Sequence, residues 1–159
     1  MENKRPSIDQ YFLKIAACVA ERSTCTRRHV GAVLVCDKHI ISTGYNGAAA
    51  GTSDCLSLGC LRNEQNIPSG TRHEICRAIH AEQNAIIQAA LHGGNVENAT
   101  LYCTHTPCIL CAKILVNARI KRFVTCSKYS DDAFMELFKE ANVHIDFLPQ
   151  PEDRLIFHY

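Results

Sequence analysis

Two short motifs combine residue types that bind transition metals with a carboxylate that could transfer protons. The first is HAE at residues 80–82, and the second is PCILC at residues 107–111. Cysteines three apart lie on one face of a helix, and the free amides of a helix N-terminus favour the thiolate, which is the form that binds metal. His80, Cys108 and Cys111 would give zinc three ligands and an open fourth position, the arrangement of a catalytic site.

Glu82 is the candidate general acid and base beside that zinc. One neutral imidazole and two thiolates balance the charge of Zn²⁺, so a bound water is less acidified than on three imidazoles. A nearby carboxylate must therefore help to take its proton. The second motif alone leaves an alternative open, because CxxC between a strand and a helix is also the layout of a thioredoxin-like redox site. The pair H-x-E with P-C-x-x-C is the signature of zinc deaminases.

The elements that must position these motifs alternate along the chain. Ser7 followed by Gln10 is a capping-box signal for the first helix, and each motif begins a later helix. Alternating strands and helices in the second half favour parallel pairing, whereas a tight turn at Asp37-Lys38 predicts an antiparallel hairpin in the first half. We expect helices at about 8–22, 80–91, 108–118 and 132–141, and strands at about 30–37, 39–45, 99–104, 122–127 and 143–148. These elements predict an α/β, three-layer α-β-α fold with a mixed five-stranded sheet.

A long segment interrupts this pattern. Residues 46–74 are rich in Gly, Ser, Asn and Cys and show no helical or strand period. A stretch of this length without structure of its own needs something to hold it. We expect one deaminase-sized domain over residues 1–159, with a Cys-rich insertion loop at about 46–76. Residues 46–76 are called the insertion loop.

Composition excludes several classes of partner. The 159 residues carry a net charge of +1, and proteins that track polynucleotides usually have a strong basic excess. No apolar run is long enough to span a bilayer, and the first residues do not resemble a signal peptide. We therefore expect a cytoplasmic protein with no polynucleotide or membrane partner, in which clustered cysteines indicate metal rather than disulfides.

Three stretches together resemble the deoxycytidylate (dCMP) deaminase family of the cytidine-deaminase-like superfamily: TGYNG (43–47), HAEQNAI (80–86) and TPCILC (106–111). The resemblance implies zinc-dependent hydrolytic deamination of dCMP to dUMP, which supplies thymidylate synthesis. It gives Glu82 the proton transfers and assigns substrate binding to Asn46, Ala81 and Tyr129. Asn46 has a second interpretation as a turn residue with positive φ before a glycine. Arg27 and Arg28 could neutralise a phosphate or simply be solvated.

The resemblance also implies features beyond the catalytic centre. Members of the family assemble as homo-oligomers, and dCTP and dTTP act on them as effectors. Some hold a second, structural zinc, whose ligands here would be Cys25, Cys55, His73 and Cys76, with Cys60 as a substitute. Free thiols in a loop are the alternative. Three alternatives for the function stay open: a deaminase of another cytosine nucleotide or nucleoside, a thioredoxin-like CxxC redox protein, and a non-catalytic zinc module.

Overall fold

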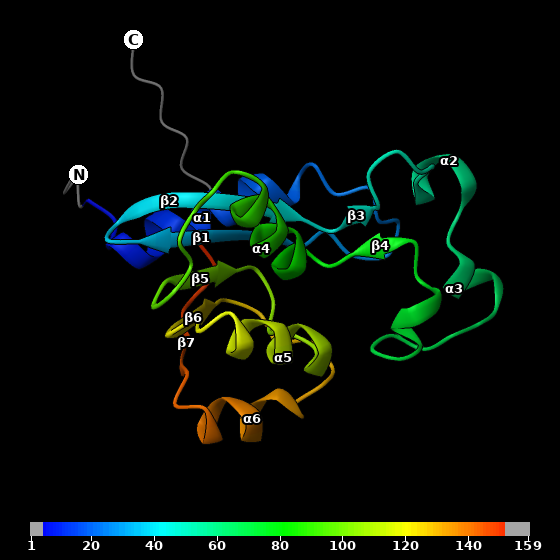
Figure 1. Cartoon of the computed structure of the whole chain (residues 1–159). Helices are drawn as coiled ribbons and strands as arrows, with labels where there is room; N and C mark the ends of the chain where they lie inside the picture. The colour runs from blue at the N-terminus through cyan, green and yellow to red at the C-terminus, as the bar shows by residue number, and fades with distance from the viewer. Residues whose placement is uncertain (1–4, 152–159) are drawn as a thin grey trace, which may run out of the picture.

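The computed structural model of the chain describes residues 5–151, which form a five-stranded sheet with helices on both sides (Figure 1). Each predicted helix and strand is present, most of them shortened by one to three residues at one or both ends. The elements in chain order are α1 (Ile8–Ala20), β1 (Gly31–Cys36), β2 (His39–Tyr45), β3 (Gly47–Ala48), α2 (Cys55–Leu58), α3 (Leu61–Glu64), η1 (His73–Ile75), β4 (Ala78–Ile79), α4 (Ala81–Leu91), β5 (Thr100–Cys103), α5 (Ile109–Asn117), β6 (Arg122–Thr125), α6 (Phe134–Glu140) and β7 (His144–Phe147).

The sheet is mixed, as predicted. Its strand order is β2-β1-β5-β6-β7, with β1 antiparallel to both β2 and β5 and with β5, β6 and β7 parallel. The hairpin turns at Asp37 and Lys38, both of which have positive φ, the backbone geometry that matches the twist of tightly connected strands. Strand β1 is buried over nearly its whole length, because helices cover both of its faces.

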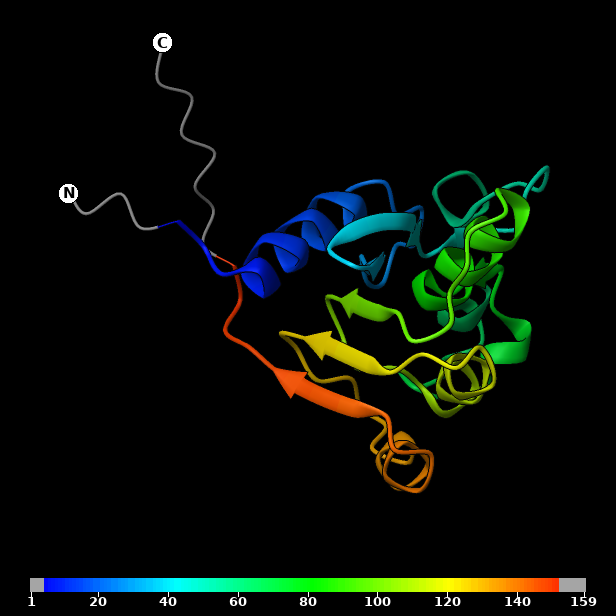
Figure 2. The same ribbon diagram turned by 60° about the vertical axis from the view of Figure 1, so that its left-hand side comes forward.

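Two separate cores make the three layers. Phe12 and Leu13 of α1 pack on one face of the sheet against Val33, Tyr102 and Val124. Helices α4, α5 and α6 cover the other face, as the turned view in Figure 2 shows, and fill a larger core. That core includes Leu34, Ala85, Leu101, Leu115, Phe123, Phe134 and Phe138. Ser7 caps α1 by accepting a hydrogen bond from the amide of Gln10 at 3.2 Å. Among residues 5–151, no helix is long and apolar enough to cross a membrane.

The insertion loop has more local structure than its sequence pattern indicates. It holds the short helices α2 and α3 and the turn η1, and Asp54 caps α2 by accepting from the amide of Ser57 at 2.9 Å. Strands β3 and β4 pair with each other, so the two ends of the loop lie side by side. Figure 1 places α2, α3, β3 and β4 together beyond one end of the five-stranded sheet. These polar residues form short helices and a strand pair through contacts with one another, which hydrophobic periodicity does not predict.

Helix α4 lies very close to β2. A Cβ built on Gly44 of β2 would fall 2.2 Å from the carbonyl oxygen of Ala81 and 2.4 Å from the amide nitrogen of Ala85. Real Cβ atoms do not come that near to backbone, so only glycine permits this approach. The contact fixes the first turn of α4 against the sheet, and this turn carries the HAE motif.

Candidate active site

The two metal-binding motifs meet where α4 and α5 begin. His80 is the residue directly before the first turn of α4, and Cys108 holds the same position in α5, with Cys111 three residues further on. The backbone amide of His80 donates to the side chain of Gln83 at 3.1 Å, which fixes the start of α4. The ligands therefore stand at helix starts, where unpaired amides and the helix dipole favour negative charge.

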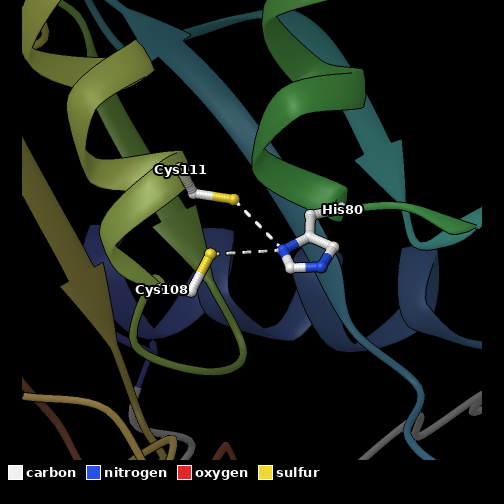
Figure 3. Close-up of side chains that lie close together, drawn as sticks. All are labelled: His80, Cys108 and Cys111. Atoms are coloured by element: carbon white, nitrogen blue, oxygen red, sulfur yellow. Dashed lines mark hydrogen bonds between the residues drawn. The ribbon is translucent and has the colours of Figure 1, made fainter. Parts of the chain in front are cut away.

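The three ligand side chains point at one another (Figure 3). Nδ1 of His80 lies 3.2 Å from Sγ of Cys111 and 3.5 Å from Sγ of Cys108. A tetrahedral zinc holds nitrogen and sulfur ligands about 3.6 Å apart, so this donor set fits the metal. Among residues 5–151, this is the one group of three or more His, Cys, Asp and Glu whose ligand atoms all lie within 4.8 Å of one another.

The electrostatics of these groups favour metal binding. The hydrogen bond from the Cys111 thiol, followed by that from the His80 ring, holds the pKa of Cys108 at about 4, although burial opposes this. The same hydrogen bond raises the pKa of Cys111, so Cys108 ionises first. Burial disfavours the imidazolium of His80, but Cys108 and Glu82 outweigh it and raise the pKa of His80. A cation placed between these three side chains would stabilise both thiolates and keep the ring neutral.

Glu82 is a buried carboxylate in the first turn of α4. Its side chain is 5% exposed, and burial raises its pKa to about 7, against the attraction of His80. A carboxyl group with a pKa near neutrality can both accept and return a proton at physiological pH. Glu82 lines the same pocket as His80 and Cys108, so this proton carrier is next to the metal ligands.

The predicted substrate residues line this pocket as well. Ala81 and Tyr129 are part of its wall, and Arg28 lies over the ring of Tyr129 with its guanidinium carbon 4.8 Å from the ring centroid. Arg27 also lines the pocket and donates through Nη1 to the carbonyl of Ile67 at 3.1 Å. Two cations therefore face the pocket from the segment that follows α1.

Asn46 also lines the pocket, but most of its hydrogen bonds hold the backbone. Its Oδ1 accepts from the hydroxyl of Ser23 at 2.6 Å and from the amide of Val30 at 2.9 Å, and its Nδ2 donates to the carbonyl of Arg28 at 2.8 Å. Its φ is not positive, so the alternative interpretation of Asn46 as a left-handed turn residue is wrong. The side chain instead shapes the segment that carries the two arginines.

The cysteines of the insertion loop gather beside the same pocket. Cys25, Cys55, Cys60 and Cys76 all line it, and burial followed by the charges of Cys60, Cys76 and Cys25 raises the pKa of Cys55. Cys60, predicted only as a substitute ligand, therefore lies with the other three thiols.

His73, predicted as a ligand of the second zinc, has its ring beside that of His80. Its ring centroid is 4.9 Å from that of His80 and 6.3 Å from that of Tyr129. Both ring nitrogens are buried without a hydrogen-bond partner. Arg72, directly before it, has a left-handed backbone, and the turn η1 then directs the ring of His73 toward the catalytic side.

Other residues of the pocket wall were not predicted from the sequence. His105 and Thr106 precede PCILC and line the pocket, as do Arg62 and Ser69 from the insertion loop. Because His105 and Thr106 directly precede the metal-binding motif, the sequence could have predicted that they line the pocket. The sequence does not predict the same for Arg62, because the burial of an arginine in a polar loop depends on how the loop closes over the pocket.

Comparison with known proteins agrees with this geometry. Residues 6–127 match the family described as the cytidine and deoxycytidylate deaminase zinc-binding region. The chain belongs to this family. The predicted family is therefore confirmed, and zinc is the metal that the family binds.

Similar proteins cover most of the chain. A deoxycytidylate deaminase of Schizosaccharomyces pombe is 37% identical over 95% of the chain, which spans about half (47%) of that relative's length. A deoxycytidylate deaminase of Mycobacterium phage D29 is 39% identical over 76% of the chain and 94% of its own length. The crystal structure of a dCMP deaminase from the cyanophage S-TIM5, in complex with dCMP and dUMP, has a TM-score of 0.77 at 25% identity. That match covers 92% of this chain and all of the phage chain. The predicted fold is confirmed by this likeness.

Proposed function

We propose that the chain hydrolyses the exocyclic amine of dCMP to give dUMP and ammonia. The observation that carries the proposal is that one pocket is lined by metal ligands, a buried carboxylate and arginines from two segments. Support for this substrate comes from relatives that are deoxycytidylate deaminases and from the cyanophage enzyme bound to dCMP and dUMP. Arg27 and Arg28 offer the positive charge that a nucleoside 5′-phosphate requires and a nucleoside does not.

His80, Cys108 and Cys111 would hold the zinc, which when bound lowers the pKa of a water at its open position and presents that water to C4 of cytosine. Glu82 takes one proton from the water and gives it to ring N3; it then takes the second proton, from the hydroxyl newly bonded to C4, and gives it to the amine, which leaves as ammonia while the C4 carbonyl forms. Its burial suits these transfers, because the neutral and charged forms are close in free energy at neutral pH. Ala81 and Tyr129 would bound the base, and the free amide hydrogen of Asn46 would reach the sugar.

Substitution of Glu82 tests the proposal. Glu82→Gln keeps the shape of the side chain and removes its proton transfer, so we expect ammonia release from dCMP to fall about 10²- to 10⁴-fold. Zinc content should be unchanged. Glu74→Gln is the matched control, since Glu74 is exposed and pairs with Arg72 outside the pocket. Activity of Glu82→Gln near that of the control would refute the assignment.

A panel of dCMP, dCTP, deoxycytidine and cytidine, followed by the ultraviolet change from cytosine to uracil, separates dCMP from the other cytosine substrates. The redox alternative has less support, because Cys108 and Cys111 are buried and directed at His80. Reduction of insulin without any bound zinc would favour it.

We further propose that a second, structural zinc binds Cys25, Cys55, Cys60 and Cys76. These four thiols line one pocket, but no three of their sulfur atoms lie within 4.8 Å of one another, so a bound zinc would have to draw them together. A closed site of this kind would hold the insertion loop against the segment after α1. We expect two zincs per chain in the wild type and one in Cys60→Ser, whereas His73→Asn keeps both. Loss of zinc from His73→Asn with full zinc in Cys60→Ser would instead favour the set that includes His73.

A homo-oligomer is the proposed assembly. Ile87 and Leu91 lie one turn apart on α4 and are 45% and 70% exposed, and Leu110 and Ile114 on the adjacent α5 are 46% and 38% exposed. Such a patch is typical of a protein interface. Light scattering should give a mass above that of one chain, and Leu91→Lys should lower it. Stimulation by dCTP and inhibition by dTTP, and a cytoplasmic location, remain predictions from the sequence.

A further inference from the structure

Arg62 is an unusual residue, because its charge is buried without a countercharge. The residue is 6% exposed and lies in α3 of the insertion loop. Its Nη2 donates to the carbonyl of Pro68 at 2.9 Å, and its Nε is buried without a hydrogen-bond partner. Within residues 5–151 it forms no salt bridge. Burying a guanidinium in this way is costly unless an anion joins it.

The surroundings of Arg62 are cationic. Arg27 binds the carbonyl of Ile67 and Arg62 binds that of Pro68, so two guanidinium groups hold consecutive residues of one segment. Both line the pocket together with Arg28. In the described part of the chain, Glu82 is the one carboxylate among the residues that line this pocket. The pocket thus holds more positive charge than its own acidic groups can balance.

Two anions could meet this need, namely the thiolates of the cysteine cluster or an anion that enters the pocket. Arg77 acts on the thiol side, because its charge lowers the pKa of Cys55. Arg62 lines the pocket together with His80 and Glu82, whereas Arg77, whose Nε is also buried without a hydrogen-bond partner, is not part of its wall. The buried Nε of Arg62 is therefore the donor that awaits a ligand beside the catalytic centre.

We infer that Arg62 binds the 5′-phosphate of the substrate and is the residue through which the insertion loop selects a nucleotide over a nucleoside. This inference rests on the proposed function. Guanidinium groups bind phosphate oxygens through paired N–H donors. Arg62 supplies these donors from α3 of the insertion loop, and Arg27 and Arg28 supply charge from the segment that follows α1. Ser69, in the same wall, can donate a further hydrogen bond.

The test compares Arg62→Gln with Arg62→Lys and with Arg72→Gln. Arg72 is exposed in the same loop and pairs with Glu74, so its variant is the matched control. A charge-assisted hydrogen bond corresponds to roughly 10- to 100-fold in affinity. We expect Arg62→Gln to raise the KM for dCMP by that factor and to leave the kinetics with deoxycytidine within about twofold. Arg62→Lys should recover part of the loss, and Arg72→Gln should behave as wild type.

The affinities for dUMP and deoxyuridine, measured by calorimetry, test the role of Arg62 without relying on turnover. Arg62→Gln should weaken dUMP but not deoxyuridine, with an unchanged zinc content. Equal losses for both ligands, loss of zinc, or no change would overturn the inference and give Arg62 a structural role or none. If the wild type deaminates neither dCMP nor deoxycytidine, the proposed function fails, while the two binding measurements still decide the role of Arg62.

Discussion

Gly44 offers a strict test of how the sheet positions the catalytic helix. A methyl group at this position would lie 2.2 Å from the carbonyl oxygen of Ala81, and ordinary van der Waals contact begins at 3.4 Å. In Gly44→Ala, helix α4 must therefore move away from β2 by roughly 1.2 Å. A misplacement of about 1 Å at a catalytic group can cost about 100-fold in rate. Forcing a methyl group into packed backbone costs about 1–3 kcal/mol.

We expect Gly44→Ala to remain folded, to melt roughly 3–10 °C lower than wild type, and to lose about 100-fold in kcat for dCMP. Gly94→Ala is the control at the other end of the same helix. Its added Cβ would lie 2.5 Å from Cγ2 of Ile41, a side-chain methyl that can rotate away, and at ordinary contact distance, 3.5 Å, from the carbonyl oxygen of Ala89. Melting would be followed by circular dichroism and kcat by ultraviolet absorbance. A Gly44→Ala protein with wild-type kcat and melting temperature would refute the argument that glycine sets the position of α4.

Three further predictions concern stability. The hydrogen bond from Arg122 holds the pKa of Asp9 below its ordinary value, so the stabilisation is present above about pH 4 and is lost as pH falls through the lowered pKa. Asp9→Asn should lower the melting temperature at pH 7 by a few degrees, and this difference should shrink as the pH is lowered below about 4. Asn46→Ala leaves the amide of Val30 without its acceptor and the carbonyl of Arg28 without its shorter hydrogen bond, which should cost about 2–4 kcal/mol in a urea titration; a loss below about 1 kcal/mol would contradict this. Removal of zinc by a chelator should speed proteolytic cleavage within residues 49–77 more than elsewhere, as mass spectrometry of the fragments would show.

The sequence predicted secondary structure best where hydrophobic periodicity, helix capping and turn chemistry act locally. The helix starts at His80 and Cys108 follow from motifs that also serve as helix boundaries, and the hairpin turn at Asp37 follows from turn chemistry. Strand order is a different matter, because pairing of β1 with β5 depends on contacts distant along the chain. Period and motif predict which segments are strands, but they do not fix which strands become neighbours.

The insertion loop shows where local reasoning fails. The family resemblance implies that His73 is a zinc ligand together with Cys25, Cys55 and Cys76; the backbone is left-handed at Arg72, and the ring of His73 lies beside that of His80, a neighbour that the sequence does not indicate. The role of Arg62 in the pocket wall could not be predicted from the sequence, since this loop arginine becomes buried only when the loop folds over the pocket. Both outcomes depend on the path of the backbone through a segment that has no period.

The pairing of β3 with β4 makes the insertion loop a separable part of the chain. Ala48 lies directly opposite Ala78, so residues 49–77 leave and rejoin the fold at neighbouring points. A short hairpin could join these two residues without moving the sheet or the starts of α4 and α5. The catalytic centre and the part of the pocket wall that includes Arg62 are thus encoded in different stretches of sequence. Evolution or an engineer can exchange the second to change substrate choice while the first is inherited intact.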